Sequence, residues 1–139
     1  MAKNLREAYK EVFKTMHADA LENRDEAAKI RQTAENALEA EKEHLAELKE
    51  TARICKENFA SQGRVLRTSA KNVQPLGVLT DIANNILRYV SSNERIPEAE
   101  ENVSKKRAEL ATCKQNLMRA EADLSAIRHF LTEGFDEEE

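Results

Sequence analysis

The feature that most constrains this chain is a strict seven-residue repeat toward its C-terminal end. Large apolar residues recur at intervals of seven, and a second series accompanies them three residues later. Such a heptad pattern places apolar residues along one stripe of an α-helix and is typical of a coiled coil. It predicts a helix over 97–133. The first series is Ile96, Val103, Leu110, Leu117, Leu124 and Leu131, and the second is Ala99, Lys106, Cys113, Ala120 and Ile127.

The N-terminal part of the chain also carries a single apolar stripe, which predicts a helix over 4–60. Its steps are all three or four residues, and only Asn23 and Glu41 on it are polar. Consecutive steps of four occur within 12–20 and 30–38, which predicts local unwinding of a supercoil there. The stripe consists of Leu5, Tyr9, Val12, Met16, Ala20, Asn23, Ala27, Ile30, Ala34, Leu38, Glu41, Leu45, Leu48, Ala52, Cys55 and Phe59.

Residues 61–74 interrupt the apolar pattern and are expected to form a loop at the tip of a hairpin. This stretch has no acidic residue and contains three basic ones, Arg64, Arg67 and Lys71. A small basic loop of this kind is a weak indication of binding to an anion or a nucleic acid. An ordinary solvated loop is the simpler interpretation.

Two prolines mark expected helix starts in the second half of the chain, because proline is tolerated in the first turn of a helix. Pro75 is expected to open a helix over 75–91, with an apolar stripe that runs from Leu76 through Leu79, Ala83 and Ile86 to Val90. Pro97 is expected to open the heptad helix. The acidic tail over 134–139 is expected to fray.

These segments predict one all-α domain over 1–139. The expected fold is a long antiparallel coiled-coil hairpin whose second arm is broken into two helices. Aligning the apolar stripes pairs Val12 with Leu124, and it brings Glu41 opposite Arg95 at the break. The alternative is an elongated three-helix bundle, in which the helix over 75–91 folds back on the others.

The helix over 75–91 carries more apolar residues than one partner helix covers. An exposed apolar patch of this kind marks an interaction surface. We expect Val78 and Ile82 to lie partly outside the paired face, and we expect another chain to cover the patch. The predicted interaction residues are Val78, Leu79, Ile82, Ile86, Leu87 and Val90.

Composition restricts the function classes. Charged residues make up 35% of the chain and aromatic residues only 4%, and acids and bases alternate through most of its length at a net charge of −4. This pattern is typical of solvated helix faces and not of a membrane-embedded protein. The N-terminus lacks the apolar stretch of a signal peptide. Cys55 and Cys113 are expected to be free thiols, so a cytoplasmic location is expected.

Catalytic motifs are missing from the sequence. Glu41 and His44 have the Glu-x-x-His spacing of di-iron helical bundles, but that chemistry needs a second such pair and two further carboxylates. A polar residue on the paired face beside a surface histidine is the simpler interpretation. We therefore expect no enzyme, no metal and no cofactor.

The preferred function is a non-catalytic assembly, scaffold or adaptor subunit, as a homo-oligomer or within a larger assembly. Small viral or phage assembly proteins and host-interference proteins often have such compositions. A nucleic-acid-binding module that uses the basic tip is one alternative. A chaperone-like holder of client chains, acting through the apolar middle helix, is another.

Overall fold

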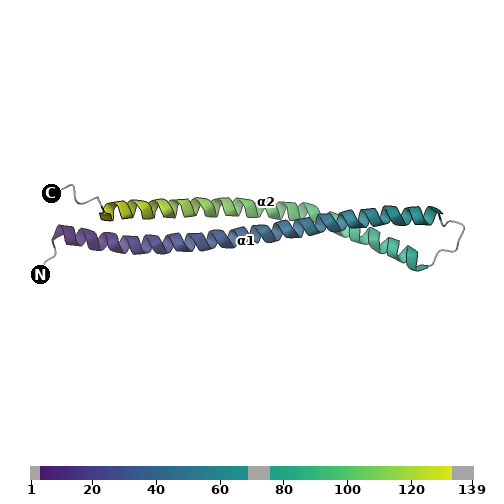
Figure 1. Cartoon of the computed structure of the whole chain (residues 1–139), viewed down its shortest axis with the longest axis horizontal. Coiled ribbons are helices and arrows are strands. Elements are labelled where there is room, and N and C mark those ends of the chain that lie inside the picture. Colours follow the sequence, from purple (N-terminus) through teal and green to yellow (C-terminus); the bar gives the residue numbers. More distant parts are fainter. Residues whose placement is uncertain (1–3, 69–75, 133–139) are drawn as a thin grey trace. The chain divides into compact units, whose positions relative to one another are not determined.

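The computed structural model describes residues 4–68 and 76–132, without the side chains of 65–68, 76 and 78. These residues form two helices, α1 over Leu5–Thr68 and α2 over Leu76–Thr132 (Figure 1). Asn4 caps α1, because its side-chain Oδ1 accepts a hydrogen bond of 2.8 Å from the backbone N–H of Glu7. The expectation of an all-α hairpin is confirmed.

The described chain divides into two packed units. The first unit comprises Asn4, residues 5–37 of α1 and residues 107–132 of α2. Here the helices run antiparallel: the Tyr9 hydroxyl donates a hydrogen bond of 3.3 Å to the Phe130 carbonyl, and Arg128 Nε donates one of 3.2 Å to His17 Nε2. The rings of Phe13 and Phe130 lie 5.6 Å apart.

The second unit comprises residues 38–68 of α1 and 76–106 of α2. Its helices are also antiparallel, since Asn85 Nδ2 donates to Gln62 Oε1 at 3.0 Å and Lys49 Nζ lies 3.8 Å from a carboxylate oxygen of Glu100. Its packed face, which we call the seam in both units, buries mostly small or medium side chains. The buried residues of this unit are Leu38, Leu48, Ala52, Cys55, Ser92, Ala99 and Val103.

The expected break in the second arm is wrong, because α2 is one continuous helix with Pro97 inside it. The three-helix alternative is wrong for the same reason. Proline in a helix interior removes one hydrogen bond and crowds the preceding turn. Pro97 is exposed on the outer side, so the seam passes it undisturbed. Along α2 of the second unit the buried and half-buried seam residues keep the heptad spacing, as Ile82, Asn85, Tyr89, Ser92, Ile96, Ala99 and Val103.

The seam of α1 also departs from the expected stripe in the first unit. Half-buried His17 and Arg31 replace Met16 and Ile30, which are 42% and 52% exposed. A regular heptad series on α2 is matched best by an equally regular series on its partner, so the two expected stutters are absent. The seam of α1 here is Phe13, His17, Ala20, Arg24, Ala27, Arg31 and Ala34. Arginine tolerates such positions because its long stem packs while its guanidinium pairs with a nearby acid, Arg24 with Asp25 at 2.9 Å and Arg31 with Glu35 at 3.8 Å.

The expected register is also wrong. Pairing Val12 with Leu124 would bring Phe13 level with Asp123, whereas Phe13 contacts Phe130, one heptad further along α2. Glu41 and Arg95 form no ion pair in the described structure, where Arg95 lies beside His44 instead. A heptad pattern shifted by seven residues still matches itself, so the apolar stripes leave the register open.

Helix boundaries differ modestly from expectation. The N-terminal helix was expected to end at 60, but α1 continues to Thr68, so residues 61–68 of the expected tip loop are helical. The rest of that loop, over 69–74, lies outside the described residues, as does the acidic tail over 134–139. Cys55 and Cys113 are free thiols, buried and half-buried respectively, on the seams of the second and first units.

Candidate interaction surfaces

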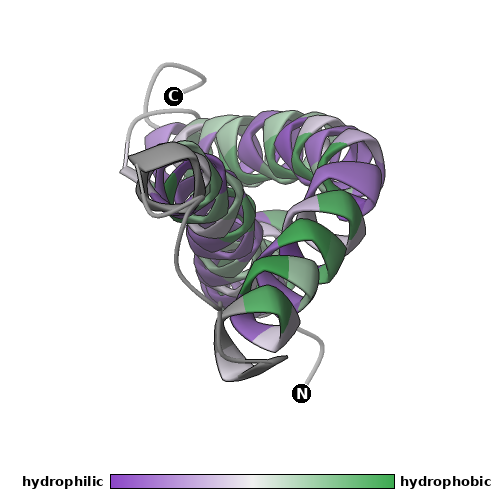
Figure 2. Cartoon of the chain, turned by 90° about the vertical axis from the view of Figure 1, so that its right-hand side faces the viewer, coloured by the Kyte–Doolittle hydropathy of each residue, from purple (hydrophilic) through white to green (hydrophobic). Residues whose placement is uncertain are grey.

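The first candidate surface lies on α2 in the second unit. Leu79, Ile86 and Val90 are 48%, 42% and 42% exposed, and Leu87 is 65% exposed. With the exposed Ala83 between them, these five residues form what we call the α2 surface. Figure 2 shows the first turns of α2, the lower of the two helices in front, coloured largely hydrophobic.

The α2 surface corrects the expected arrangement of this helix. Leu79, Ile86 and Val90 were expected on the seam, whereas Ile82 was expected partly outside it. The structure shows the reverse: Ile82 is half-buried on the seam, and the other three lie one residue further round the helix. The reason is that the seam residues before Pro97 continue the same seven-residue spacing as the heptad series that follows it. The side chain of Val78 lies outside the described residues.

The α2 surface is uncharged and continuous with a groove between the two helices. From Leu79 the members Ala83, Ile86 and Val90 follow at steps of four, three and four residues, which is the spacing of a helix-packing stripe, and Leu87 lies beside them. Asp81 and Arg88, the charged residues within that span, fall on the opposite side at 100° per residue. The groove measures about 310 Å³ and is lined by Cys55, Lys56, Phe59, Asn85, Ile86 and Tyr89.

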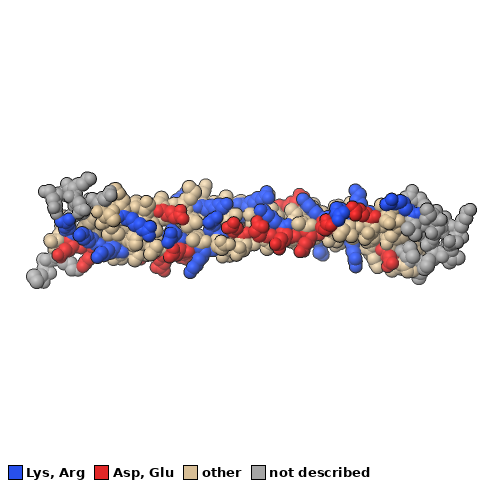
Figure 3. Space-filling view, viewed as in Figure 1, with Lys and Arg blue, Asp and Glu red and all other residues tan. Residues whose placement is uncertain are grey.

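Charged side chains elsewhere on the second unit are arranged as ordinary solvated pairs. Arg53 Nη1 donates to Glu57 at 2.7 Å, and Arg53 also donates to Glu50. The hydrogen bond from Arg53 lowers the pKa of Glu50. Figure 3 shows Lys and Arg interspersed with Asp and Glu over the face in view. This mixture favours no single-sign ligand.

The basic tip is described only in part. Arg64 is exposed on α1, and its Nε donates a hydrogen bond of 3.5 Å to the Ala60 carbonyl. The side chain of Arg67 and the whole of Lys71 lie outside the described residues. Binding of an anion or nucleic acid at this tip therefore stays a prediction from the sequence.

The Glu41–His44 spacing leads to no site that the structure supports. Glu41 is half-buried, and His44 is exposed beside a small polar hollow of about 250 Å³ that Arg95, Glu98, Ala99 and Asn102 also line. Within residues 4–68 and 76–132, no three His, Cys, Asp or Glu side chains are grouped closely enough to hold a metal ion. The helices in the same ranges include none that is long and apolar enough to cross a membrane.

Comparison with models of protein families, with curated proteins and with solved structures found no match. The function must therefore be inferred from the chain's own surfaces.

A second candidate surface, in the first unit, was missed in the sequence. It is a groove of about 790 Å³ along one side of the two helices, which we call the first-unit groove. Exposed Met16 and Phe130 stand at one end of it, at 42% and 47% exposure. A seven-residue repeat without stutters, applied to α1, would have predicted this groove. Such a repeat places His17 on the seam and leaves Met16 beside it. Its lining residues are Phe13, Met16, Asp19, Ala20, Asn23, Ala27, Asn116, Arg119, Ala120, Asp123, Ala126, Ile127 and Phe130.

Proposed function

We propose that this chain is a non-catalytic coiled-coil subunit that acts by binding protein surfaces, as an assembly, scaffold or adaptor component. One observation carries the proposal: large apolar side chains stand exposed at helix-packing spacing on the α2 surface. Beside them the seam holds polar Asn85 and Ser92. A helix that leaves its more apolar stripe in water is suited to receive another helix there.

The α2 surface is tested by replacing Leu79 and Ile86 together with aspartate. Each replacement puts a charge where a partner helix would bury an apolar side chain, so we expect association through this surface to weaken at least tenfold. Sedimentation of the purified chain measures self-association, and capture by the tagged chain from its native source measures binding to other proteins. Circular dichroism on the same samples should show helix content unchanged.

A matched control adds the same charge to the same helix away from the α2 surface. Asn84 and Ser91 are exposed and lie to one side of the stripe, so Asn84→Asp with Ser91→Asp should leave association as it is in the unaltered chain. If the test variant and the control agree in both mass and captured proteins, the α2 surface is not an interface. Loss of helix content in the test variant alone would assign Leu79 and Ile86 to the core.

A further inference from the structure

The first turns of α1 extend past the end of α2. Phe130 lies level with Phe13, because their rings are 5.6 Å apart, and α2 ends two residues later at Thr132. Helix α1 begins at Leu5. Roughly its first 9 Å, at 1.5 Å per residue, therefore have no described residue of α2 opposite them. The chain continues from the end of α2 with residues 133–139, so this segment starts beside the uncovered turns.

Large apolar side chains are exposed at this end of the first unit. Leu5 and Val12 are 78% and 56% exposed, and Met16 and Phe130 are exposed as well. On α1 the three apolar residues each precede a position of the seam repeat by one residue, and Phe130 does so on α2. In an antiparallel pair, such positions lie on the same side of both helices. Together these four residues form what we call the end surface.

The seam positions beside the end surface are basic. Arg6 and Lys10 continue the seven-residue repeat of α1 toward its start. Lys10 is exposed, and within the described ranges it forms no ion pair. Glu7 and Glu11 each follow one of these positions, so they lie on the flank opposite the end surface. A negatively charged segment is therefore attracted to these turns from the side of the end surface.

The acids on the same side as the end surface lie further along the unit. Asp19 and Asp123 line the first-unit groove. Asp19 is seven residues from Val12, or about 10 Å along α1, and Asp123 lies seven residues from Phe130 on α2. Repulsion from this pair keeps an acidic segment at the end of the unit and out of the groove.

Residues 133–139 have the chemistry that fits this end. They comprise one large apolar residue, Phe135, one glycine and five acids. Gly134 follows the last residue of α2 by two positions, which is where a helix-ending glycine commonly lies. The residue after such a glycine often contacts the third residue from the helix end. Here these are Phe135 and Phe130, and the exposed ring of Phe130 offers an aromatic partner.

The segment is long enough to cover the whole end surface. Seven extended residues span up to about 23 Å, more than twice the uncovered length of α1. The acids over 136–139 can therefore reach Lys10 while Phe135 stays beside Phe130. A short tethered segment also acts at an effective concentration on the order of millimolar. This favours it over a separate chain as the occupant of the same surface.

We propose that residues 133–139 cover the end surface of their own chain, with Phe135 against Phe130 and Val12 and with the acids beside Lys10. The segment then serves as an internal competitor, because a protein that binds the end surface must first displace it. The inference uses no residue of the α2 surface, so its outcome is separate from that of the proposed function.

Phe135→Trp in the full chain tests the proposal, because the protein has no tryptophan of its own. A covered indole should emit at a shorter wavelength than N-acetyltryptophanamide in the same buffer, and acrylamide should quench it less. The shift should not depend on protein concentration, because the contact lies within one chain. Adding Lys10→Glu and Val12→Asp should abolish the shift, since they oppose the acids and remove the apolar contact.

The matched control places the same charges on the same side of α1 beyond the reach of Phe135. Ile30 is 52% exposed and lies about 27 Å along the helix from Val12, so Lys29→Glu with Ile30→Asp should keep the shift. Emission like that of the free indole, a shift that disappears on dilution, or a shift that survives Lys10→Glu with Val12→Asp would each overturn the proposal. So would equal loss in the two variants. Circular dichroism of every variant should show unchanged helix content, since all four replaced residues are exposed.

Discussion

Replacing Leu124 with alanine is expected to lower the free energy of unfolding by about 2–4 kcal/mol. Leu124 is only 3% exposed, on a seam where most neighbouring positions hold small or polar residues. The first unit has few large buried side chains, so a cavity at this position removes much of its apolar packing. Denaturant unfolding followed by circular dichroism, at one fixed protein concentration, measures the change.

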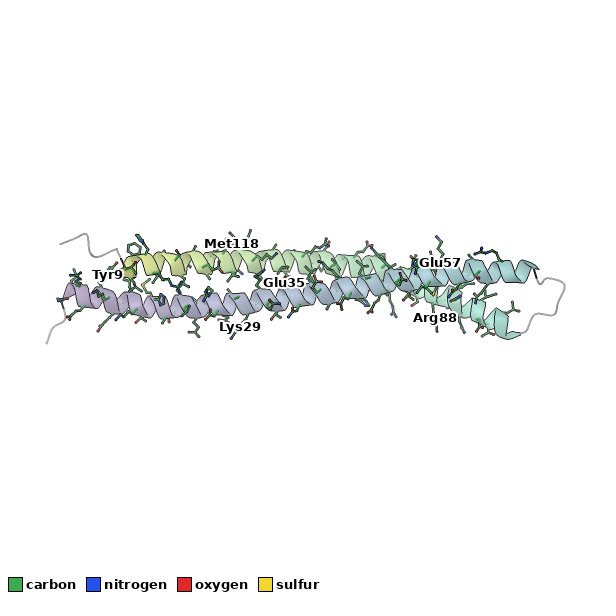
Figure 4. All side chains as sticks on the ribbon, viewed as in Figure 1. Tyr9, Lys29, Glu35, Glu57, Arg88 and Met118 are labelled. Atoms are coloured by element: carbon green, nitrogen blue, oxygen red, sulfur yellow. The ribbon has the colours of Figure 1, made fainter. Side chains whose placement is uncertain are left out.

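Met118 provides the control for Leu124. It lies on the same helix, is 68% exposed and points away from α1 (Figure 4). Met118→Ala should change the free energy of unfolding by no more than about 0.5 kcal/mol. Equal effects of the two replacements would mean that the seam does not run along Leu117, Leu124 and Leu131.

Pro97→Ala is expected to raise the free energy of unfolding by about 1–3 kcal/mol. Proline inside α2 leaves the Asn93 carbonyl without its helical N–H donor and crowds the turn before it. Alanine supplies the donor and removes the ring. Pro97 is exposed, so the seam is unchanged by the replacement. Urea unfolding of the two chains under identical conditions gives the difference.

The same replacement separates a continuous α2 from a broken one. If a helix began at Pro97, the proline would occupy a first-turn position that suits it, and alanine there would be neutral or destabilising. Glu98→Ala, at the next exposed position, controls for a general effect of alanine on helix propensity. A proline replacement that stabilises no more than this control would contradict the continuous helix.

Much of the fold could be predicted because helix pairing depends on a repeated local pattern. The heptad series from Ile96 to Leu131 identified the seam of that part of α2, and its buried or half-buried members include Val103, Leu110 and Leu124. The scarcity of glycine and proline predicted long helices, and the similar lengths of the two arms predicted a hairpin. These inferences use only the period of the helix and the size of side chains.

The errors arose where two stripes competed. Between Leu79 and Val90 the more apolar stripe was assigned to the seam, but the seam follows the stripe through Ile82, Asn85 and Tyr89. Geometric continuity along one helix outweighed local hydrophobicity there. Apolar content alone does not reveal this, because a stripe that binds a second partner is as apolar as one that closes the hairpin.

The candidate surfaces were predictable to different extents. Leu79, Ile86, Leu87 and Val90 were named from the excess of apolar residues on one helix, and the structure leaves all four exposed. Whether they bind a partner stays a prediction. The first-unit groove depends on which residues of α1 and α2 lie at one level. Predicting which residues lie level requires the pairing register of the two helices. A heptad pattern does not specify that register, because it matches itself after a shift of seven residues.

The measurement that tests the central claim most directly is the mass of the unaltered chain in solution across a wide range of concentration. Light scattering or sedimentation equilibrium should give at least twice the 15.8 kDa of one chain at high concentration, and a fall toward that value on dilution. A mass of 15.8 kDa at every concentration, together with no protein captured from the native source, would contradict the account.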